Sequence, residues 1–371
     1  MKNNKNLILI LIIFFIISIN SIYSFSIYLT KDTYSLVIRQ ILFYLIGTIT
    51  IIMLLKTKPE TIKKYSTLIY IINVISLILV LLVGTEANGS KAWFTLPLIG
   101  TLQPSEFMKI GLILQIAKII DNQKIETTKD ELHLLSKIAI ITIIPSIITF
   151  LEPDTGAVLI YLIIAFVMLF TSKLRLRWFI ILFSFLIIAI SLLFYIYIFQ
   201  TELFIKIFGS SMFYRFDRIF DWNNKSGIQL ENSVISIGSS GLFGKGIGNI
   251  LLYFPEGHTD FIFSSFSSIY GLTGILILII SITCFDIIIL KTKTNKAVIS
   301  GIAGALIYQQ IQNISMTIGL LPITGITLPF ISYGGSSLIS YMILLGIIMS
   351  IRANRKTTNK NIWLQMFFRY K

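Results

Sequence analysis

Long apolar runs separated by short polar segments dominate the chain. Each run approaches the roughly 20 residues that a helix needs to cross a lipid bilayer. The first run follows two lysines, as a signal peptide would, but it is long and no small-residue cleavage site follows it, so we interpret it as an uncleaved span. The pattern predicts ten spans, at approximately 7–27, 36–55, 67–84, 104–120, 137–151, 156–172, 178–199, 261–290, 297–318 and 328–351. The predicted fold class is an all-α polytopic membrane protein, a single integral membrane domain over residues 1–371.

The basic residues favour one orientation of these spans. With a cytoplasmic N-terminus, the cytoplasmic segments hold 22 Lys and Arg residues and the opposite segments hold 8. Because membrane proteins retain basic loops in the cytoplasm, both termini are predicted there. A large extracytoplasmic loop then falls at about 200–260, between the seventh and eighth spans, and a cytoplasmic tail at about 352–371.

The composition narrows the classes of function. With 55% hydrophobic and 13% charged residues, the chain is no ordinary soluble domain. The topology accounts for the net charge of +14, so no nucleic-acid partner is expected. A single cysteine excludes an intramolecular disulfide, and two histidines argue against a His-rich metal centre.

One polar segment precedes the fourth span. Pro104 suits the first turn of a helix, which places Glu106 and Lys109 on one helix face, three residues apart. Two ionisable groups entering lipid together are either a structural ion pair or a contact for substrate or partner, and the sequence leaves both open. Trp93 alone would be an interfacial anchor, whereas Lys91 and Trp93 together suit a sugar that carries an anionic linkage.

A second polar segment, FPEGHTDFIF, precedes the eighth span at residues 254–263. Glu256, His258 and Asp260 place three titratable groups at the entry to an apolar run. A partly desolvated carboxylate there suits a general base, but an Asp before a helix is equally a helix N-cap. His258 is interpreted as an orienting residue rather than a metal ligand, since no second histidine is near.

Two further segments interrupt the apolar pattern. The glycine-rich residues 237–249 resemble a phosphate-binding loop, or else are a tightly packed backbone that lines a cavity. Residues 319–340 contain two prolines and no charge. They predict either a broken helix that exposes backbone dipoles to an anionic ligand or a turn packed around Gly334 and Gly335.

Five motifs together resemble the SEDS family, the bacterial RodA, FtsW and SpoVE proteins. They are QPSEFMKI, LEPDTGA, IGSSGLFGKG, PEGHTDFIF and LPITGITLPFISYGGSSL, in that order along the chain. The resemblance covers essentially all ten spans. The last motif, following NISMTIG, is more similar to RodA than to FtsW.

The resemblance implies an inverting peptidoglycan glycosyltransferase in the cytoplasmic (inner) membrane of a bacterium. It would polymerise lipid II at the outer face, with a class B penicillin-binding protein and other elongation or division proteins as partners. A RodA-like role in elongation and cell shape is expected, with FtsW-like division as the alternative. The essential acid of the family matches Asp260, and the acid of its Pro-Asp turn matches Asp154, for which a structural role is at least as suitable. The tryptophan, the base and the acid–base pair of the QPSEF region match Trp93, Lys91, Glu106 and Lys109.

These matches predict a mechanism. Asp260 would take the proton from an attacking sugar hydroxyl, with His258 and Glu256 orienting it. Cations would stabilise the departing pyrophosphate, and a divalent cation is a further candidate, although no cofactor is assigned. The candidate cations are Lys91, Lys109, Arg215 and Arg218.

The sequence departs from the family in three places. Ala92 stands where a second basic residue is common, and Asn232 where a glutamine is common. Ser268 and Ile269 replace a pair of glutamates. Roles that the family gives to those positions are not carried over.

Two other classes of function stay open. A transporter or lipid flippase would also contain broken helices and intramembrane charge, but the chain has no internal repeat and its charge gathers at one side. A non-catalytic assembly scaffold would depend on its surfaces rather than on Asp260.

Overall fold

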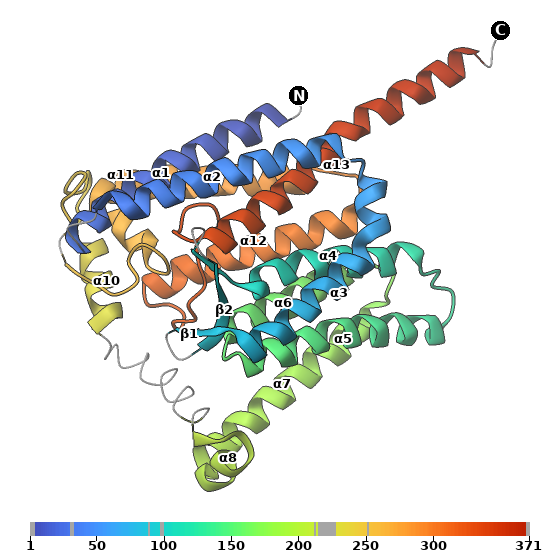
Figure 1. Ribbon diagram of the computed structural model, residues 1–371. Helices are drawn as coiled ribbons and strands as arrows, with labels where there is room; N and C mark the ends of the chain where they lie inside the picture. The colour runs from blue at the N-terminus through green and yellow to red at the C-terminus, as the bar shows by residue number, and fades with distance from the viewer. Residues whose placement is uncertain are drawn as a thin grey trace.

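Ten helices of the computed structural model coincide with the ten predicted spans. The structure describes residues 4–29, 33–87, 90–96, 100–210, 213, 228–250 and 252–368, so Arg215 and Arg218 lie outside the described residues. The helices run side by side and form one bundle (Figure 1). They are α1 (Lys5–Leu29), α2 (Thr33–Lys56), α3 (Pro59–Val83), α4 (Pro104–Asn122), α5 (Thr128–Leu151), α6 (Thr155–Leu169), α7 (Leu176–Phe199), α11 (Ile262–Leu290), α12 (Lys296–Thr317) and α13 (Gly335–Phe368).

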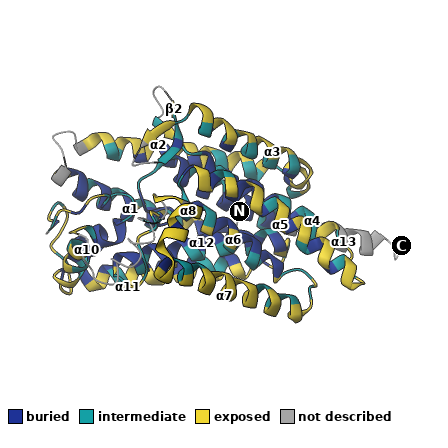
Figure 2. Cartoon of the chain, turned by 90° about the horizontal axis from the view of Figure 1, so that it is seen from below, coloured by how far each residue is buried: buried dark blue, intermediate teal, exposed yellow. Residues whose placement is uncertain are grey.

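Seven helices within the described residues are long and apolar enough to cross a membrane. The three others are α4, α6 and α12. Helix α6 is short, whereas α4 and α12 carry buried polar side chains such as Lys109, Gln309 and Asn313. These helices tolerate polar groups because neighbouring helices shield them from lipid (Figure 2). A bundle interior can therefore be more polar than its lipid-facing surface.

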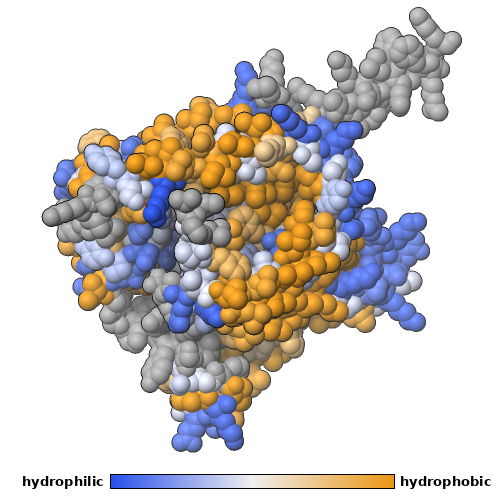
Figure 3. All heavy atoms as spheres, in the orientation of Figure 1, coloured by the Kyte–Doolittle hydropathy of each residue, from blue (hydrophilic) through white to orange (hydrophobic). Residues whose placement is uncertain are grey.

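Hydrophobic residues cover the middle of the surface, and hydrophilic residues gather at the end where α4 passes into α5 (Figure 3). That end also holds the N-terminal residues of α1 and the basic segments that the sequence predicts to be cytoplasmic. The opposite end, which carries residues 85–102 and 252–261, is called the outer end below, following the charge-based orientation.

A small antiparallel sheet stands at the outer end, which the all-α prediction did not include. Its strands are β1 (Thr85–Ala87), β2 (Ser90–Leu96) and β3 (Gly100–Leu102), in the order β1-β2-β3. They fill the segment between α3 and α4. The sheet has short strands and little alternation, so the apolar pattern gave no signal for it.

The boundaries of three predicted spans differ clearly from those of the helices, including α3, which begins at Pro59 rather than 67. The last helix begins at Gly335 instead of 328, because residues 328–334 form a loop whose backbone bonds to the 256–260 turn. It also continues to Phe368, through the predicted cytoplasmic tail. Helix α5 begins at Thr128, nine residues before the predicted span, because Thr127 and Asp130 form a capping box.

Helix α7 leans away from the bundle and buries Tyr197 alone along its length (Figure 2). Its first turn is held by Glu131 of α5, a buried carboxylate. Arg177 NH2 and Trp178 Nε1 donate to Glu131 Oε2 at 2.8 and 3.0 Å. Helices α8 (Thr201–Phe208) and α10 (Ile228–Gly238) lie in the predicted outer loop that follows α7.

The glycine-rich segment is tightly packed backbone, docked on a kink of α11. Gly271 interrupts α11 with φ 61°, and Lys245 N donates to Ser268 O at 2.9 Å. A Cβ at Gly244 would lie 2.1 Å from Ile269 O, so side-chain-free backbone is required for the contact. The predicted tight packing of this backbone is therefore correct. The prediction that it lines a cavity is wrong, because no described residue of this segment lines the cavity described below.

The docking contact predicts a difference between two glycines of this loop. Gly244→Ala should lower stability by about 1–2 kcal/mol for its positive φ and by a further 1–3 kcal/mol, roughly, for the overlap with the Ile269 carbonyl. Gly246→Ala is the matched control, because Gly246 also has a positive φ but only the Asn249 amide within 4 Å, at 3.9 Å. Thermal unfolding of the purified variants in detergent should give a lower midpoint for Gly244→Ala than for Gly246→Ala. Equal midpoints for the two variants would contradict the packing argument.

Candidate functional site

A cavity of about 640 Å³ lies at the outer end of the bundle. Its walls come from eight segments: α2, the sheet, the starts of α4, α6 and α13, the 256–260 turn, the 324–327 loop, and α12 through Gln309. Four carboxylate side chains and Trp93 face this one space. The carboxylates are Glu106, Asp154, Glu256 and Asp260.

The 256–260 turn is fixed through its backbone carbonyls. Each of the five accepts a hydrogen bond, which leaves no backbone carbonyl of this turn unpaired. Glu256 O accepts from Thr259 N and Phe261 N, and Gly257 O from Ser265 Oγ at 2.6 Å. The remaining three reach across to other elements: His258 O to Tyr333 N at 2.9 Å, Thr259 O to Ser332 Oγ at 2.6 Å, and Asp260 O to Asn313 Nδ2 at 2.7 Å.

Asn313 of α12 joins this turn to the loop before α13. Its side chain is fully buried, and its amide donates to both Asp260 O and Ile326 O at 2.7 Å. One amide therefore sets the distance between the two segments that flank Asp260. Sequence reasoning did not select Asn313, because a single Asn in an apolar helix has many structural uses.

Asp260 is not a helix cap. Helix α11 begins after Phe261, and no side chain caps it. A Cβ added to Gly325 would lie 3.6 Å from Asp260 Oδ2, so the carboxylate lies against the 324–327 loop, and both line the cavity. Burial, and then the charges of Glu256 and Asp154, raise the pKa of Asp260 to about 7. A pKa close to the operating pH suits a general base, which must accept a proton and then release it.

Glu256 and His258 support the turn in different ways. Glu256 has φ 56°, a conformation that costs a non-glycine residue free energy, and its carboxylate accepts from Thr259 Oγ1 at 2.7 Å. His258 stacks on Phe25 and packs against Tyr333 rather than lining the cavity. Burial lowers the pKa of His258 although Glu256 opposes this, so the ring is held neutral.

Asp154 is a structural cap that also faces the cavity. It is the N-cap of α6, and its Oδ1 accepts from Ala157 N at 3.0 Å. Its Oδ2 accepts from Gln103 Nε2 and Ser105 Oγ at 2.9 and 3.0 Å, which ties α6 to the start of α4. Burial is the main cause that raises the pKa of Asp154.

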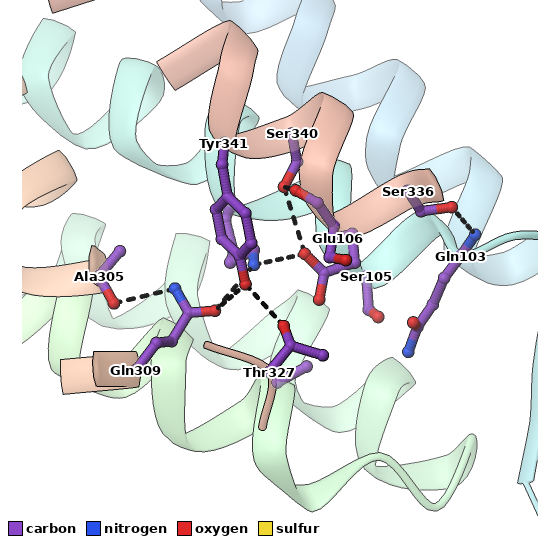
Figure 4. A network of polar contacts seen from close by, with 12 residues as sticks. Gln103, Ser105, Glu106, Ala305, Gln309, Thr327, Ser336, Ser340 and Tyr341 are labelled. Carbon is purple, nitrogen blue, oxygen red and sulfur yellow. Dashed lines mark hydrogen bonds and ion pairs between the residues drawn. The ribbon is translucent and has the colours of Figure 1, made fainter. Parts of the chain in front are cut away.

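Glu106 and Lys109 form the predicted pair on one face of α4. Lys109 Nζ lies 2.5 Å from Glu106 Oε2 and 3.2 Å from Gln309 Oε1, and it stands 4.8 Å from the centre of the Tyr341 ring. Figure 4 shows this network, in which Tyr341 OH joins Gln309 to Thr327. Glu106 lines the cavity but Lys109 does not, so the carboxylate stands between the ammonium group and the cavity.

The remaining candidates for substrate binding differ in whether they line the cavity. Trp93 lines the cavity from β2, whereas Lys91 of the same strand donates to Leu82 O at 3.0 Å and is not among the lining residues. Arg39 of α2 does line the cavity. Sequence reasoning passed over Arg39 because it lies inside an apolar span far from every motif.

The described residues do not fit a metal centre. No group of three or more His, Cys, Asp or Glu side chains is close enough within them to hold an ion. The chemical steps proposed below therefore do not use a divalent cation.

Comparisons with known proteins agree with this architecture. The chain is 34% identical over 326 residues to a probable peptidoglycan glycosyltransferase FtsW of Buchnera aphidicola, covering 83% of this chain and 80% of the relative. The crystal structure of the Thermus thermophilus rod shape determining protein RodA matches with a TM-score of 0.67 and 25% identity, covering 94% of this chain and 96% of that one. A chain from a structure of a peptidoglycan synthase complex that coordinates polymerization and crosslinking matches the fold with a TM-score of 0.75 at 24% identity, covering 93% of this chain and 97% of that one.

The model of one family of cell cycle proteins matches residues 4–357, nearly the whole chain. The SEDS resemblance drawn from the five motifs is thereby confirmed. The chain belongs to the FtsW/RodA/SpoVE family.

Proposed function

We propose that this protein is a peptidoglycan glycosyltransferase that polymerises lipid II at the outer face of the cytoplasmic membrane. The observation that carries the proposal is a single cavity in which Asp260, with a pKa of about 7, faces an aromatic side chain and further carboxylates. The names of relatives such as the FtsW of Buchnera aphidicola support the same activity.

Asp260 is the proposed general base. An acceptor hydroxyl attacks the anomeric carbon of a pyrophosphate-linked sugar, the hydroxyl proton passes to the Asp260 carboxylate, and the bond between that carbon and the pyrophosphate oxygen breaks. A single displacement inverts the anomeric configuration. Pyrophosphate leaves without protonation by a general acid, so one carboxylate suffices for the chemistry.

Other residues position Asp260 and the sugar. Asn313 fixes the main chain of Asp260, and Glu256 contributes a nearby negative charge that adds to burial in raising the Asp260 pKa. Trp93 offers an aromatic face for a sugar ring. Because the Lys109 ammonium group is already held by Glu106, Gln309 and the Tyr341 ring, we assign the Glu106–Lys109 pair to the structure of the cavity wall.

The orientation and the partner follow from the same proposal. With both termini cytoplasmic, the cavity faces outside, where lipid-linked disaccharides are polymerised. A class B penicillin-binding protein is the proposed partner, since a structural neighbour comes from a complex that joins polymerization to crosslinking. A flippase would place its charge near the bilayer midplane instead, and a scaffold would not need a base of raised pKa.

Replacing the base should abolish polymerisation. Asp260→Asn keeps the shape of the side chain but cannot accept the proton, so the rate should fall about 10²- to 10⁴-fold. Lipid II polymerisation by the purified protein in vesicles, with its partner present, measures this. Asp286→Asn is the control, an acid of helix α11 that lies outside the cavity and contacts Gln310. Near-wild-type glycan synthesis by Asp260→Asn would refute the assignment.

Polymerisation should also rise with pH across the neutral range. The pKa of Asp260 lies above its ordinary value, at about 7, so below that pH the carboxyl is protonated and cannot act as a base. Initial rates between pH 5.5 and 8.5 should give an ascending limb centred near 7, measured at saturating lipid II. A flat profile across this interval would contradict the role of Asp260.

The cellular role has two candidates. The C-terminal motifs favour elongation, whereas relatives named FtsW favour division. Depletion in the native bacterium separates them: loss of an elongation polymerase should give rounded cells, and loss of a division polymerase should give filaments. Cell shape under the microscope is the measurement, with re-expression of the wild-type chain as the control. We propose elongation as the first candidate, and filaments would overturn it.

A further inference from the structure

The cavity contains an imbalance of charge. Arg39 is the single Lys or Arg among its described lining residues, against four carboxylates. Any anionic group that enters this space meets one full positive charge. Its position therefore indicates where such a group would bind.

Arg39 belongs to a wall made by α2 and the start of α13. Burial raises the pKa of the Tyr333 hydroxyl, and the nearby Arg39 guanidinium opposes this, so the two side chains lie close together. Gln40 Oε1 accepts from Gly334 N, and a Cβ on Gly335 would lie 2.8–3.2 Å from three atoms of the Phe43 ring. The absence of a side chain at Gly335 thus allows α2 to approach the first turn of α13 closely.

The first turn of α13 contributes donors to the same wall. Gly335, Ser336 and Ser337 line the cavity, and the first N–H groups of any helix have no intrahelical acceptor. A helix N-terminus of this kind favours a negative charge beside it. The Ser336 hydroxyl is held by Gln103 N at 2.9 Å, which fixes the turn against the start of α4.

Arg39 also lies at the border between cavity and bilayer. Its neighbours on α2, Ile38 and Leu42, are 55% and 48% exposed on the lipid-facing side. One helix therefore presents an apolar surface to lipid and a guanidinium group to the cavity. A lipid-anchored anion can reach Arg39 while its tail stays in the membrane.

The carboxylates of the cavity oppose an anion less than their number suggests. Glu106 is paired with Lys109 at 2.5 Å, and Asp154 accepts three hydrogen bonds. Burial raises the pKa of Asp154, and it raises the pKa of Asp260 to about 7, so Asp260 carries less than full charge at neutral pH. Among the described lining residues, Arg39 and the first turn of α13 are the positive features that an anion meets at this wall.

We propose that Arg39 and the first turn of α13 bind the pyrophosphate of a polyprenyl-linked substrate, with the polyprenyl tail along the exposed face of α2. The inference rests on the proposed function and names the subsite for its leaving group. As the glycosyl bond breaks, the electron pair passes to the pyrophosphate oxygen, and Arg39 stabilises that charge while Asp260 holds the acceptor proton.

Binding without turnover tests the subsite. The purified protein in nanodiscs of zwitterionic lipid is titrated with undecaprenyl pyrophosphate. Arg39→Gln should weaken binding about 10- to 100-fold, the range that hydrogen bonds to charged groups span, and Arg39→Lys should lie between it and wild type. Lys206→Gln is the matched control, since it removes a cation of α8 that is exposed and outside the cavity. Unchanged thermal midpoints establish that the variants are folded.

Three further probes separate the sources of the signal. Undecaprenol should bind at least about tenfold more weakly than its pyrophosphate, and equal binding would overturn the subsite. Inorganic pyrophosphate should bind more weakly than the lipid form, and equal affinity would overturn the placement of the tail on α2. Nanodiscs rich in phosphatidylglycerol should not compete, and full competition would show a general site for anionic headgroups instead.

The outcomes also separate this inference from the proposed function. Arg39-dependent binding in a protein that does not polymerise lipid II would refute the glycosyltransferase and leave the pyrophosphate subsite standing. Polymerisation by wild type with equal binding by Arg39→Gln would refute the subsite alone.

Discussion

The structure of the cavity depends on the pairing of five backbone carbonyls, those of residues 256–260. Each would be costly to bury without a donor, and three of the donors come from elements more than 50 residues away in sequence. Asn313 of α12, with Ser332 and Tyr333 of the loop before α13, supplies them. Because the turn satisfies its hydrogen bonds only in this position, the Asp260 side chain is held between protein interior and cavity.

The position of the Asp260 side chain in turn determines its pKa. A carboxylate in water has a pKa near 4 and is a weak base at neutral pH. Partial burial and the neighbouring charge of Glu256 raise the Asp260 pKa to about 7, where proton transfer from a sugar hydroxyl is better matched. The same burial holds His258 neutral against Phe25, so this ring serves the packing of the turn.

The two charged groups that α4 brings into the bundle show how polar side chains are tolerated there. Lys109 is 1% exposed, yet Glu106, Gln309 and the Tyr341 ring surround its ammonium group. This satisfies a charge that would be expensive in lipid, and it uses the lysine for structure rather than for substrate. Arg39, on an apolar helix at the edge of the cavity, is the cation that stays reachable from inside it.

The sequence by itself determined the ten helices, because apolar runs long enough to cross a bilayer have few alternative structures. It also determined the Glu256–His258–Asp260 cluster and the Glu106–Lys109 pair, whose members are close in the chain. Only the tertiary structure decided that Asp260 faces a cavity rather than capping α11, that the glycine-rich loop docks on the Gly271 kink, and that Lys109 is enclosed. The position of Arg39 in the cavity wall and the bridging contact of Asn313 likewise follow only from the tertiary structure. Each of these depends on contacts between segments far apart in sequence, and local periodicity carries no information about them.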